Sequence, residues 1–175
     1  MKKIRSLSVI IPCYNEEHTI ESVLDEVEAV DLGPIKKEII VIDDYSTDGT
    51  RVILQKIAKQ HPRIQVLLQD RNRGKGTALR RGFEASHGDL VIVQDADREY
   101  DPRDYTKLLA LFLNDRADIV FGSRFSGGAP RRIAYLANTI GNKVMTRMSA
   151  LLSGLYVTDI HTCYIMFKGD WIRDL

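Results

Sequence analysis

The stretch VIVQDADREY, residues 91–100, joins a run of residues that favour burial to a cluster of carboxylates that favour water. Runs rich in Val and Ile are typical of strands that are covered on both faces of a sheet. Three acidic residues follow this run within five positions, namely Asp95, Asp97 and Glu99. Like charges that pack together must be paired, protonated or bound to a cation. The stretch therefore predicts a buried strand over 90–94 that ends at a site for positive charge.

Strand and helix patterns alternate along the chain on both sides of this stretch. Short apolar runs predict strands over 7–11, 38–42, 64–68, 90–94 and 119–122, and Pro12 is expected to stop the first of them. Four helical patterns are expected between these strands: from a cap at Asn15 to about Val30, to about Gln60, through Ser86, and from Asp101 as cap and Pro102 as first residue to about Asn114. An amphipathic stretch over 133–153 and an extended segment over 163–167 follow. This order predicts an α/β fold with a mostly parallel central sheet.

Size and composition fit a single domain with a buried core. The chain has 175 residues, of which 44% are hydrophobic and 28% charged, and a net charge of +1 gives no support for a nucleic-acid partner. The two cysteines, Cys13 and Cys163, lack the spacing of a metal site or a CxxC motif, which favours a reducing compartment. The apolar run near the N-terminus is too short for a signal peptide, and no stretch approaches the ~20 apolar residues of a membrane span. We therefore expect a cytoplasmic protein.

Polar side chains follow every expected strand, at the end where open α/β sheets bind ligands. In chain order they are Tyr14, Asn15 and Glu16; Asp43, Asp44 and Asp48; Asp70, Arg71, Arg73 and Lys75; Asp95, Asp97 and Glu99; and Ser123 and Arg124. Carboxylates after strands often cap the next helix, and we expect such a role for Asp101 and a capping or turn-making role for Asp48. Lys75, in a Gly-flanked loop without Walker spacing, is equally compatible with a ligand contact and a loop role. Parallel strands end at the same edge of a sheet, so these groups would lie together there as an acidic cluster flanked by cations. We call this edge, at the carboxyl ends of the strands, the rim.

The acidic cluster after the fourth strand favours a bound metal over a purely structural role. A site made only of oxygen ligands selects Mg²⁺ or Mn²⁺. Mg²⁺ typically takes one or two protein carboxylates and completes its shell with waters and substrate phosphates. We therefore expect Asp95, Asp97 and Glu99 to place a metal ion that holds a diphosphate.

Five motifs then resemble a known family, and they occur in its order: SVIIPCYNEE, EIIVIDDYSTDGT, NRGKGTALRRGFEASHGDLVIVQDADREYDP, FGSRF and VTDIHTCY. The family is the family 2 glycosyltransferases with the GT-A fold, and the chain looks most like the dolichol- or polyprenol-phosphate mannosyltransferases within it. The resemblance covers 8–168 and implies a nucleotide-sugar donor and inversion at the anomeric carbon. It also implies that 1–175 is a single catalytic domain that lacks the family's C-terminal part.

The resemblance assigns donor contacts to residues of the first four strand ends. Those that match the family's base, ribose and nucleoside segments are Pro12, Tyr14, Glu16, Ile42 and Asp44, and Lys75 is added as a further donor-binding residue. The DxD motif, where carboxylates and metal meet the diphosphate, is matched by Asp95, Ala96 and Asp97. Glu99 matches a position that completes the metal shell.

The resemblance also assigns roles to three positions later in the chain. Arg124 matches an arginine near the phosphates, where it and the metal would stabilise the leaving diphosphate. Arg132, or Arg131, resembles a basic residue that meets the acceptor phosphate, and Asp159 matches a position near the acceptor. A lipid phosphate has a second pKa near ~6 and needs little help from a base. A sugar hydroxyl would need one, and Asp159 would then be the leading candidate.

The expected reaction is transfer of mannose or glucose from GDP-mannose or UDP-glucose to polyprenyl or dolichyl phosphate at the cytoplasmic face of a membrane. Two alternatives remain: a family 2 transferase that acts on a saccharide or protein hydroxyl, and a degenerate domain that binds the donor without transfer. The stretch 133–153 is either packed in the core or lies on the membrane surface, with neighbouring cations on lipid phosphates. Those cations are Arg131, Arg132, Lys143 and Arg147.

Three residues depart from the family pattern. Arg98 stands where relatives commonly carry Leu, and we expect it either to pair with Glu99 or a phosphate, or to weaken the metal site. Tyr45 stands where many relatives have Gly. Ile165 stands where close relatives usually have Lys, so that one cation is missing.

Overall fold

The structure is a computed structural model, and it describes residues 3–122, 162 and 164–173. Its helices and strands follow one another as β1 (Ser6–Cys13), α1 (Ile20–Ala29), β2 (Lys36–Asp43), α2 (Thr50–Gln60), β3 (Ile64–Leu68), α3 (Lys75–Ala85), β4 (Leu90–Val93), the 3₁₀-helix η1 (Pro102–Asp104), α4 (Tyr105–Leu113), β5 (Ile119–Phe121), β6 (Ile165–Lys168) and α6 (Gly169–Arg173). The predicted alternation of strands and helices is confirmed.

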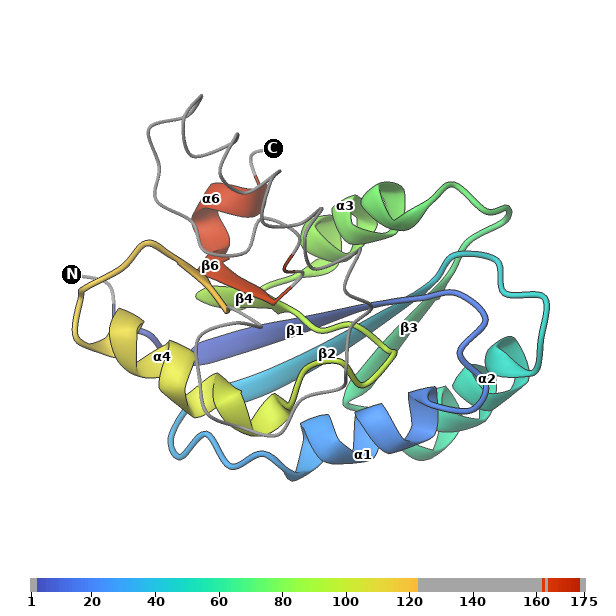
Figure 1. Cartoon of the computed structure of the whole chain (residues 1–175), viewed down its shortest axis with the longest axis horizontal. Helices are drawn as coiled ribbons and strands as arrows, with labels where there is room; N and C mark the ends of the chain where they lie inside the picture. Colours follow the sequence, from blue (N-terminus) through green and yellow to red (C-terminus); the bar gives the residue numbers. More distant parts are fainter. Residues whose placement is uncertain (1–2, 123–161, 163, 174–175) are drawn as a thin grey trace, which may run out of the picture.

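The six described strands form one mixed sheet in the order β3-β2-β1-β4-β6-β5 (Figure 1). Strands β1 to β4 pair in parallel, with Val9 of β1 opposite Ile39 of β2 and Ile92 of β4. Strand β6 lies between β4 and β5 and is antiparallel to both. The predicted α/β fold with a mostly parallel sheet is therefore confirmed.

Helices cover both faces of the sheet, as the Val and Ile runs predict. Helices α1, α2 and α4 lie on one face, and α3 and α6 lie on the other (Figure 1). Successive residues of β1 point to opposite faces, so Val9 and Ile11 belong to the first core and Ile10 to the second. In the described part of the chain, no helix has both the length and the apolar character that crossing a bilayer requires.

Helix α3 lies very close to the sheet because a glycine faces it. A Cβ atom at Gly82 would lie 2.5 Å from Cγ2 of Ile10 and 2.7 Å from Cδ1 of Ile42. Both distances are shorter than van der Waals contact, so only glycine allows this approach. The close packing brings the N-terminus of α3, which begins at Lys75, to the carboxyl ends of the strands.

Two sequence predictions at the end of β1 are wrong. Asn15 does not cap the first helix, which begins at Ile20. Its backbone is left-handed, with φ of 57°, and its Oδ1 accepts a hydrogen bond from the Thr47 N–H at 2.8 Å. Pro12 does not stop the first strand, since β1 continues to Cys13 and Pro12 pairs with Ile42 of β2.

The predicted cap at Asp101 is confirmed, whereas Asp48 makes a turn before α2, whose N-cap residue is Gly49. Oδ1 of Asp101 accepts from the Arg103 N–H at 2.9 Å and begins η1, a 3₁₀ turn that precedes α4. Oδ1 of Asp48 accepts from the Thr50 N–H at 3.0 Å, at the start of α2, and its Oδ2 accepts from the Glu17 N–H at 3.2 Å. Asp48 therefore ties the loop after β2 to the loop after β1.

Candidate functional site

The switch point of the sheet lies between the carboxyl ends of β1 and β4. From β1 the chain continues to β2 on one side, and from β4 it continues to β5 and β6 on the other. Strands β2 and β3 lie on one side of β1, whereas β4, β6 and β5 lie on the other. The carbonyl of Ile10 accepts from the Gln94 N–H, but Pro12, the next β1 residue that faces β4, has no N–H to donate. The β1–β4 ladder therefore ends at Val93, while the β1–β2 ladder continues to Cys13. Ligands of open α/β sheets bind in the crevice at such a point.

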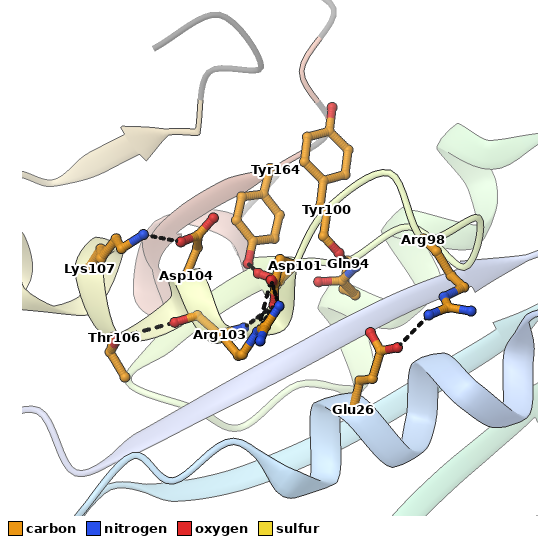
Figure 2. Close-up of polar contacts among 10 residues, drawn as sticks. All are labelled: Glu26, Gln94, Arg98, Tyr100, Asp101, Arg103, Asp104, Thr106, Lys107 and Tyr164. Atoms are coloured by element: carbon orange, nitrogen blue, oxygen red, sulfur yellow. Dashed lines mark hydrogen bonds and ion pairs between the residues drawn. The ribbon is translucent and has the colours of Figure 1, made fainter. Parts of the chain in front are cut away.

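A buried glutamine fixes the start of the acidic loop that follows β4. The side chain of Gln94 is fully buried, and its Nε2 donates to the carbonyls of Asp95 at 3.1 Å and Tyr100 at 3.2 Å. Its Oε1 accepts from the Tyr105 hydroxyl at 2.9 Å. The Tyr100 ring stacks on Tyr164, with ring centres 4.9 Å apart, beside α4 (Figure 2). The Gln94 side chain thus holds the two ends of the loop, at Asp95 and Tyr100, close together.

The carboxylates of this loop have different partners. Oδ1 of Asp95 lies 2.5 Å from Nζ of Lys75, and the Asp95 side chain is only 12% exposed. Oδ1 of Asp97 accepts from the Glu99 N–H at 2.9 Å, which closes a tight turn. Asp97 is partly exposed and Glu99 is exposed. Lys75 therefore neutralises the most buried carboxylate of the cluster, and Asp97 and Glu99 are more exposed to solvent.

Arg98 stands at the centre of that turn in a left-handed conformation, with φ of 63°. One of its terminal guanidinium nitrogens lies 2.9 Å from Oε1 of Glu26 on α1 (Figure 2). In the structure Arg98 pairs with Glu26, a partner that the sequence did not suggest, and its expected contact with a phosphate or effect on the metal site stays a prediction.

Asp44, the residue directly after β2, anchors the loop that leads into α3. Its Oδ1 accepts from Gln69 Nε2 at 2.7 Å and from the Arg73 N–H at 2.8 Å. Its Oδ2 accepts from the N–H of Gly74 at 2.8 Å, where φ of 84° requires a residue without a Cβ. Asp44 thereby sets the position of Lys75, the next residue, opposite Asp95.

The loops after β1 and β2 also meet at the rim. The Asn15 N–H donates to Oγ of Ser46 at 2.9 Å, and the tyrosines that precede these two residues are exposed: Tyr14 by 46% and Tyr45 by 42%. Glu16 is held by the Thr19 hydroxyl, which donates to Oε2 at 2.6 Å. Two aromatic rings therefore lie on neighbouring loops beside the switch point.

Three carboxylates lie near the buried Cys13 thiol, at the end of β1. Burial raises the pKa of the Cys13 thiol above its ordinary value, and the carboxylates of Asp43, Glu16 and Asp48 raise it further. A field that opposes a thiolate stabilises a cation in the same place. Asp43, Glu16 and Asp48 thus favour positive charge near the end of β1.

The structure places most of the predicted donor residues around this rim, with one difference. Pro12, Tyr14, Glu16, Asp44, Lys75, Asp95, Ala96 and Asp97 all belong to the loops or strand ends described above. The Ile42 side chain, in contrast, is fully buried against α3 and points away from the rim. The predicted residues Arg124, Arg131, Arg132 and Asp159 lie outside the described residues, as do Ser123 and the whole of the stretch 133–153.

Sequence reasoning missed the residues that hold the site in place. Gln94 was assigned to the strand and no role was given to it, although a glutamine at the end of a buried Val/Ile run signals a polar network. The partners Glu26 and Tyr164 lie 72 and 63 residues from the groups they bind, and no local pattern points to them. Gln94, Glu26 and Tyr164 therefore hold the acidic loop and the residue that follows it in place through side-chain hydrogen bonds.

The predicted metal set is compatible with the donor atoms present. Within the described ranges, no three His, Cys, Asp or Glu side chains converge as a ready-made metal cluster. Asp95 and Asp97 do supply two carboxylates from one loop, which is the number that Mg²⁺ or Mn²⁺ takes from a protein when phosphates complete its shell. The residues present therefore fit such an ion together with a diphosphate.

Comparison with known proteins assigns the chain to a family. The sequence profile described as Glycosyl transferase family 2 matches residues 8–175. A dolichol-phosphate mannosyltransferase of Pyrococcus furiosus is 34% identical over 70% of this chain and 34% of its own length. A UDP-N-acetylglucosamine–dolichyl-phosphate N-acetylglucosaminyltransferase of Methanococcus voltae is 28% identical over 95% of this chain and 71% of its own length. The chain thus spans about a third of the first of these relatives.

Solved structures agree with this assignment. The glucosyl-3-phosphoglycerate synthase of Mycobacterium tuberculosis, in complex with Mn²⁺ and UDP, is 26% identical with a TM-score of 0.70, over 95% of this chain and 57% of that one. A mannosyltransferase of Pyrobaculum calidifontis in complex with GDP-Man and Mn²⁺ is 35% identical with a TM-score of 0.51, over 56% of this chain and 29% of that one. The profile match over nearly the whole chain, the shared GT-A fold and the carboxylate loop at the switch point lead to one conclusion: the chain belongs to glycosyl transferase family 2.

Proposed function

We propose that the chain is the donor-binding part of an inverting hexosyltransferase that moves mannose or glucose from GDP-mannose or UDP-glucose to a polyprenyl or dolichyl phosphate. The observation that carries the proposal is the rim itself. Asp95 and Asp97 leave β4 at the switch point, beside two exposed tyrosines and the cation Lys75. A diphosphate needs cations and a nucleoside needs aromatic and polar groups, and the rim offers both next to each other.

The metal and the loop after β4 would act together on the leaving group. Asp95 and Asp97, with Glu99 as a further ligand, would hold Mg²⁺ or Mn²⁺, and a bound ion of this kind neutralises the charge that develops on a departing diphosphate. The Gln94 network fixes the backbone of this loop before any ligand arrives, so that its carboxylates need little rearrangement. Arg124 would add a second positive charge on the phosphates.

The proposed acceptor follows from the relatives and from its chemistry. The Pyrococcus relative is a dolichol-phosphate mannosyltransferase, and a relative from Aeromonas hydrophila, 39% identical over 61% of this chain, is an undecaprenyl-phosphate 4-deoxy-4-formamido-L-arabinose transferase. A phosphate acceptor is anionic at neutral pH and can attack the anomeric carbon without a strong general base. Such an acceptor would place the reaction at a membrane surface, on its cytoplasmic face.

A transfer assay with a lipid acceptor tests this function. The chain is incubated with GDP-mannose or UDP-glucose labelled in the sugar, with Mn²⁺ and undecaprenyl phosphate in detergent. We expect label from one donor to enter the organic phase, and this label to depend on both the lipid and the metal. Label that stays in water-soluble products when the lipid is present would contradict the proposed acceptor.

A second candidate is transfer to a hydroxyl acceptor in water. The observation that favours it is the match to glucosyl-3-phosphoglycerate synthase, which covers 95% of this chain with a TM-score of 0.70. A hydroxyl needs a general base, and Asp159 would be its leading candidate. Transfer of label to phosphoglyceric acid without any lipid, and a large loss of turnover with unchanged donor affinity in an Asp159→Asn variant, would favour this candidate.

A further inference from the structure

The tyrosine that follows Asp44 has an unfavourable backbone conformation. Tyr45 has φ of 65°, in the left-handed region, where a side chain with a Cβ crowds the following carbonyl. Bulky residues are rare there, and glycine would adopt the same backbone without strain. Strained residues of this kind cluster at binding sites, because the surrounding structure must hold them in place. The position of Tyr45 therefore calls for a reason other than folding.

The structure around Tyr45 holds the ring firmly from one side. The guanidinium carbon of Arg51 lies 5.1 Å from the centre of the Tyr45 ring, in a cation–π contact. Arg51 is itself fixed, because its Nε lies 3.3 Å from Oδ2 of the fully buried Asp43 and one of its terminal nitrogens donates to the Gln69 carbonyl at 3.3 Å. A cation that is anchored on two sides orients the ring that it contacts.

The Tyr45 side chain is partly exposed to solvent at the rim. Tyr45 is 42% exposed, and it immediately follows Asp44, whose carboxylate holds the loop that carries Lys75. The next residue, Ser46, accepts a hydrogen bond from Asn15, and Asn15 follows Tyr14, the residue that the family resemblance assigns to the donor's nucleoside. An oriented and half-open aromatic ring thus lies on the loop next to the expected nucleoside contact.

We propose that Tyr45 is a nucleobase-contacting residue, whose ring packs against the planar base of the donor while Arg51 supports it from behind. The inference rests on the proposed function and refines it, since it names a donor contact that a glycine at this position could not make. Stacking on an aromatic ring tolerates different bases, so Tyr45 contributes affinity for the nucleoside. Discrimination between bases by their exocyclic groups then depends on other residues.

Three ligands separate a contact with the base from a general effect on the loop. Wild-type chain is titrated calorimetrically with GDP, with UDP and with pyrophosphate, each in Mn²⁺. A Tyr45→Asn variant removes the ring and keeps a residue that tolerates the left-handed backbone, and a Tyr45→Phe variant keeps the ring. We expect Tyr45→Asn to weaken the tighter-binding nucleoside diphosphate by about tenfold and to leave pyrophosphate binding unchanged, with Tyr45→Phe close to wild type for both ligands.

Two results would overturn the inference and can be told apart from failure of the proposed function. Equal losses for pyrophosphate and for the nucleoside diphosphate in Tyr45→Asn would show that the residue acts through the loop and not on the base. Unchanged affinity of Tyr45→Asn for every ligand would show that the ring makes no contact. If the wild-type chain itself binds neither GDP nor UDP, the proposed function fails, and the inference fails with it.

Discussion

At the scale of single residues, Gln94 holds the loop that carries the acidic residues of the candidate site. Its side chain is fully buried at the end of β4, and its amide makes three hydrogen bonds, to the carbonyls of Asp95 and Tyr100 and from the Tyr105 hydroxyl. A buried amide is stable only when its donors and acceptors have partners. The loop that carries the acidic residues therefore keeps one shape for as long as this network is complete.

Removal of the Tyr105 hydroxyl should destabilise the protein through Gln94. A Tyr105→Phe variant leaves Oε1 of Gln94 buried without this donor, and we expect the free energy of unfolding to fall by about 1–3 kcal/mol. Chemical denaturation monitored by circular dichroism measures this change. Tyr164→Phe is the matched control, because its hydroxyl donates to the partly buried Asp101 carbonyl at 2.9 Å, and water can replace it there at lower cost. Equal stabilities of Tyr105→Phe and wild type would contradict the role given to the network.

At the scale of elements, the contact between α3 and the sheet positions Lys75 near the acidic loop. Gly82 allows the helix to lie directly on Ile10 and Ile42, and Asp44 fixes the loop before the helix. The first residue of α3, Lys75, then reaches Asp95 across 20 positions of sequence. The packing of one helix thus determines which cation meets the carboxylate of the site.

Two glycine substitutions within α3 should have opposite effects. In Gly82→Ala the new Cβ overlaps Ile10 and Ile42, and we expect a loss of about 1–3 kcal/mol in the free energy of unfolding. In Gly76→Ala, where the added Cβ meets no atom within 4 Å, the lower entropy of the unfolded chain should stabilise the protein by about 0.4–1 kcal/mol. Thermal unfolding of the two variants measures the difference, and destabilisation by both to the same extent would contradict the packing argument.

A contact between β1, β2 and the turn before β4 makes the free energy of unfolding depend on pH. Glu38 of β2 joins β1 to the turn before β4: it accepts from the Ser8 hydroxyl at 2.5 Å and from the His87 N–H at 3.0 Å, and its Oε1 lies 3.1 Å from Nδ1 of His87. Burial raises the pKa of Glu38, but the hydrogen bonds of Ser8 and His87 outweigh it, and the pKa lies below its ordinary value. The ionised carboxylate therefore stabilises the folded state.

The sign of this dependence follows from the lowered pKa. Stabilisation by Glu38 is fully present above the pKa of the unfolded chain and is lost as the pH falls through the pKa of the folded state. We expect Glu38→Gln to be less stable than wild type at pH 7, and the difference to shrink between about pH 5 and pH 3. Denaturant titrations of both proteins across this range test it. A difference that stays constant with pH would show that ionisation of Glu38 contributes nothing.

At the scale of the whole molecule, local sequence patterns predicted the fold well. The Val and Ile runs marked β1 to β4, β3 has the predicted bounds, and the turn at Asp48 and the cap at Asp101 lie where expected. These features depend on residues close together in sequence, for which period and turn chemistry are informative. The rim could be predicted for the same reason, because parallel strands bring their carboxyl ends to one edge.

The contacts that complete the site depend on residues far apart and could not be predicted in this way. Strand β6 enters antiparallel between β4 and β5, which no local pattern at 163–167 specifies. Asn15 was expected to cap a helix, but Thr47, 32 positions away, takes its side-chain oxygen. Arg98 meets Glu26 on another element, and Lys75, for which the sequence predicted a ligand contact or a loop role, pairs with Asp95. Competition between partners is decided by tertiary packing.

The central claim is that the acidic loop after β4 binds a nucleotide-sugar through a metal ion, and calorimetric titration of the donor tests it most directly. GDP-mannose and UDP-glucose are titrated into the wild-type chain and into an Asp97→Asn variant, each with and without Mn²⁺. Asparagine can still accept the Glu99 N–H, so thermal unfolding of the variant should match that of wild type. We expect one donor to bind wild type only with Mn²⁺, and this binding to be lost in Asp97→Asn. Equal affinity with and without Mn²⁺, undiminished binding by the variant, or no binding of either donor to wild type would contradict the account.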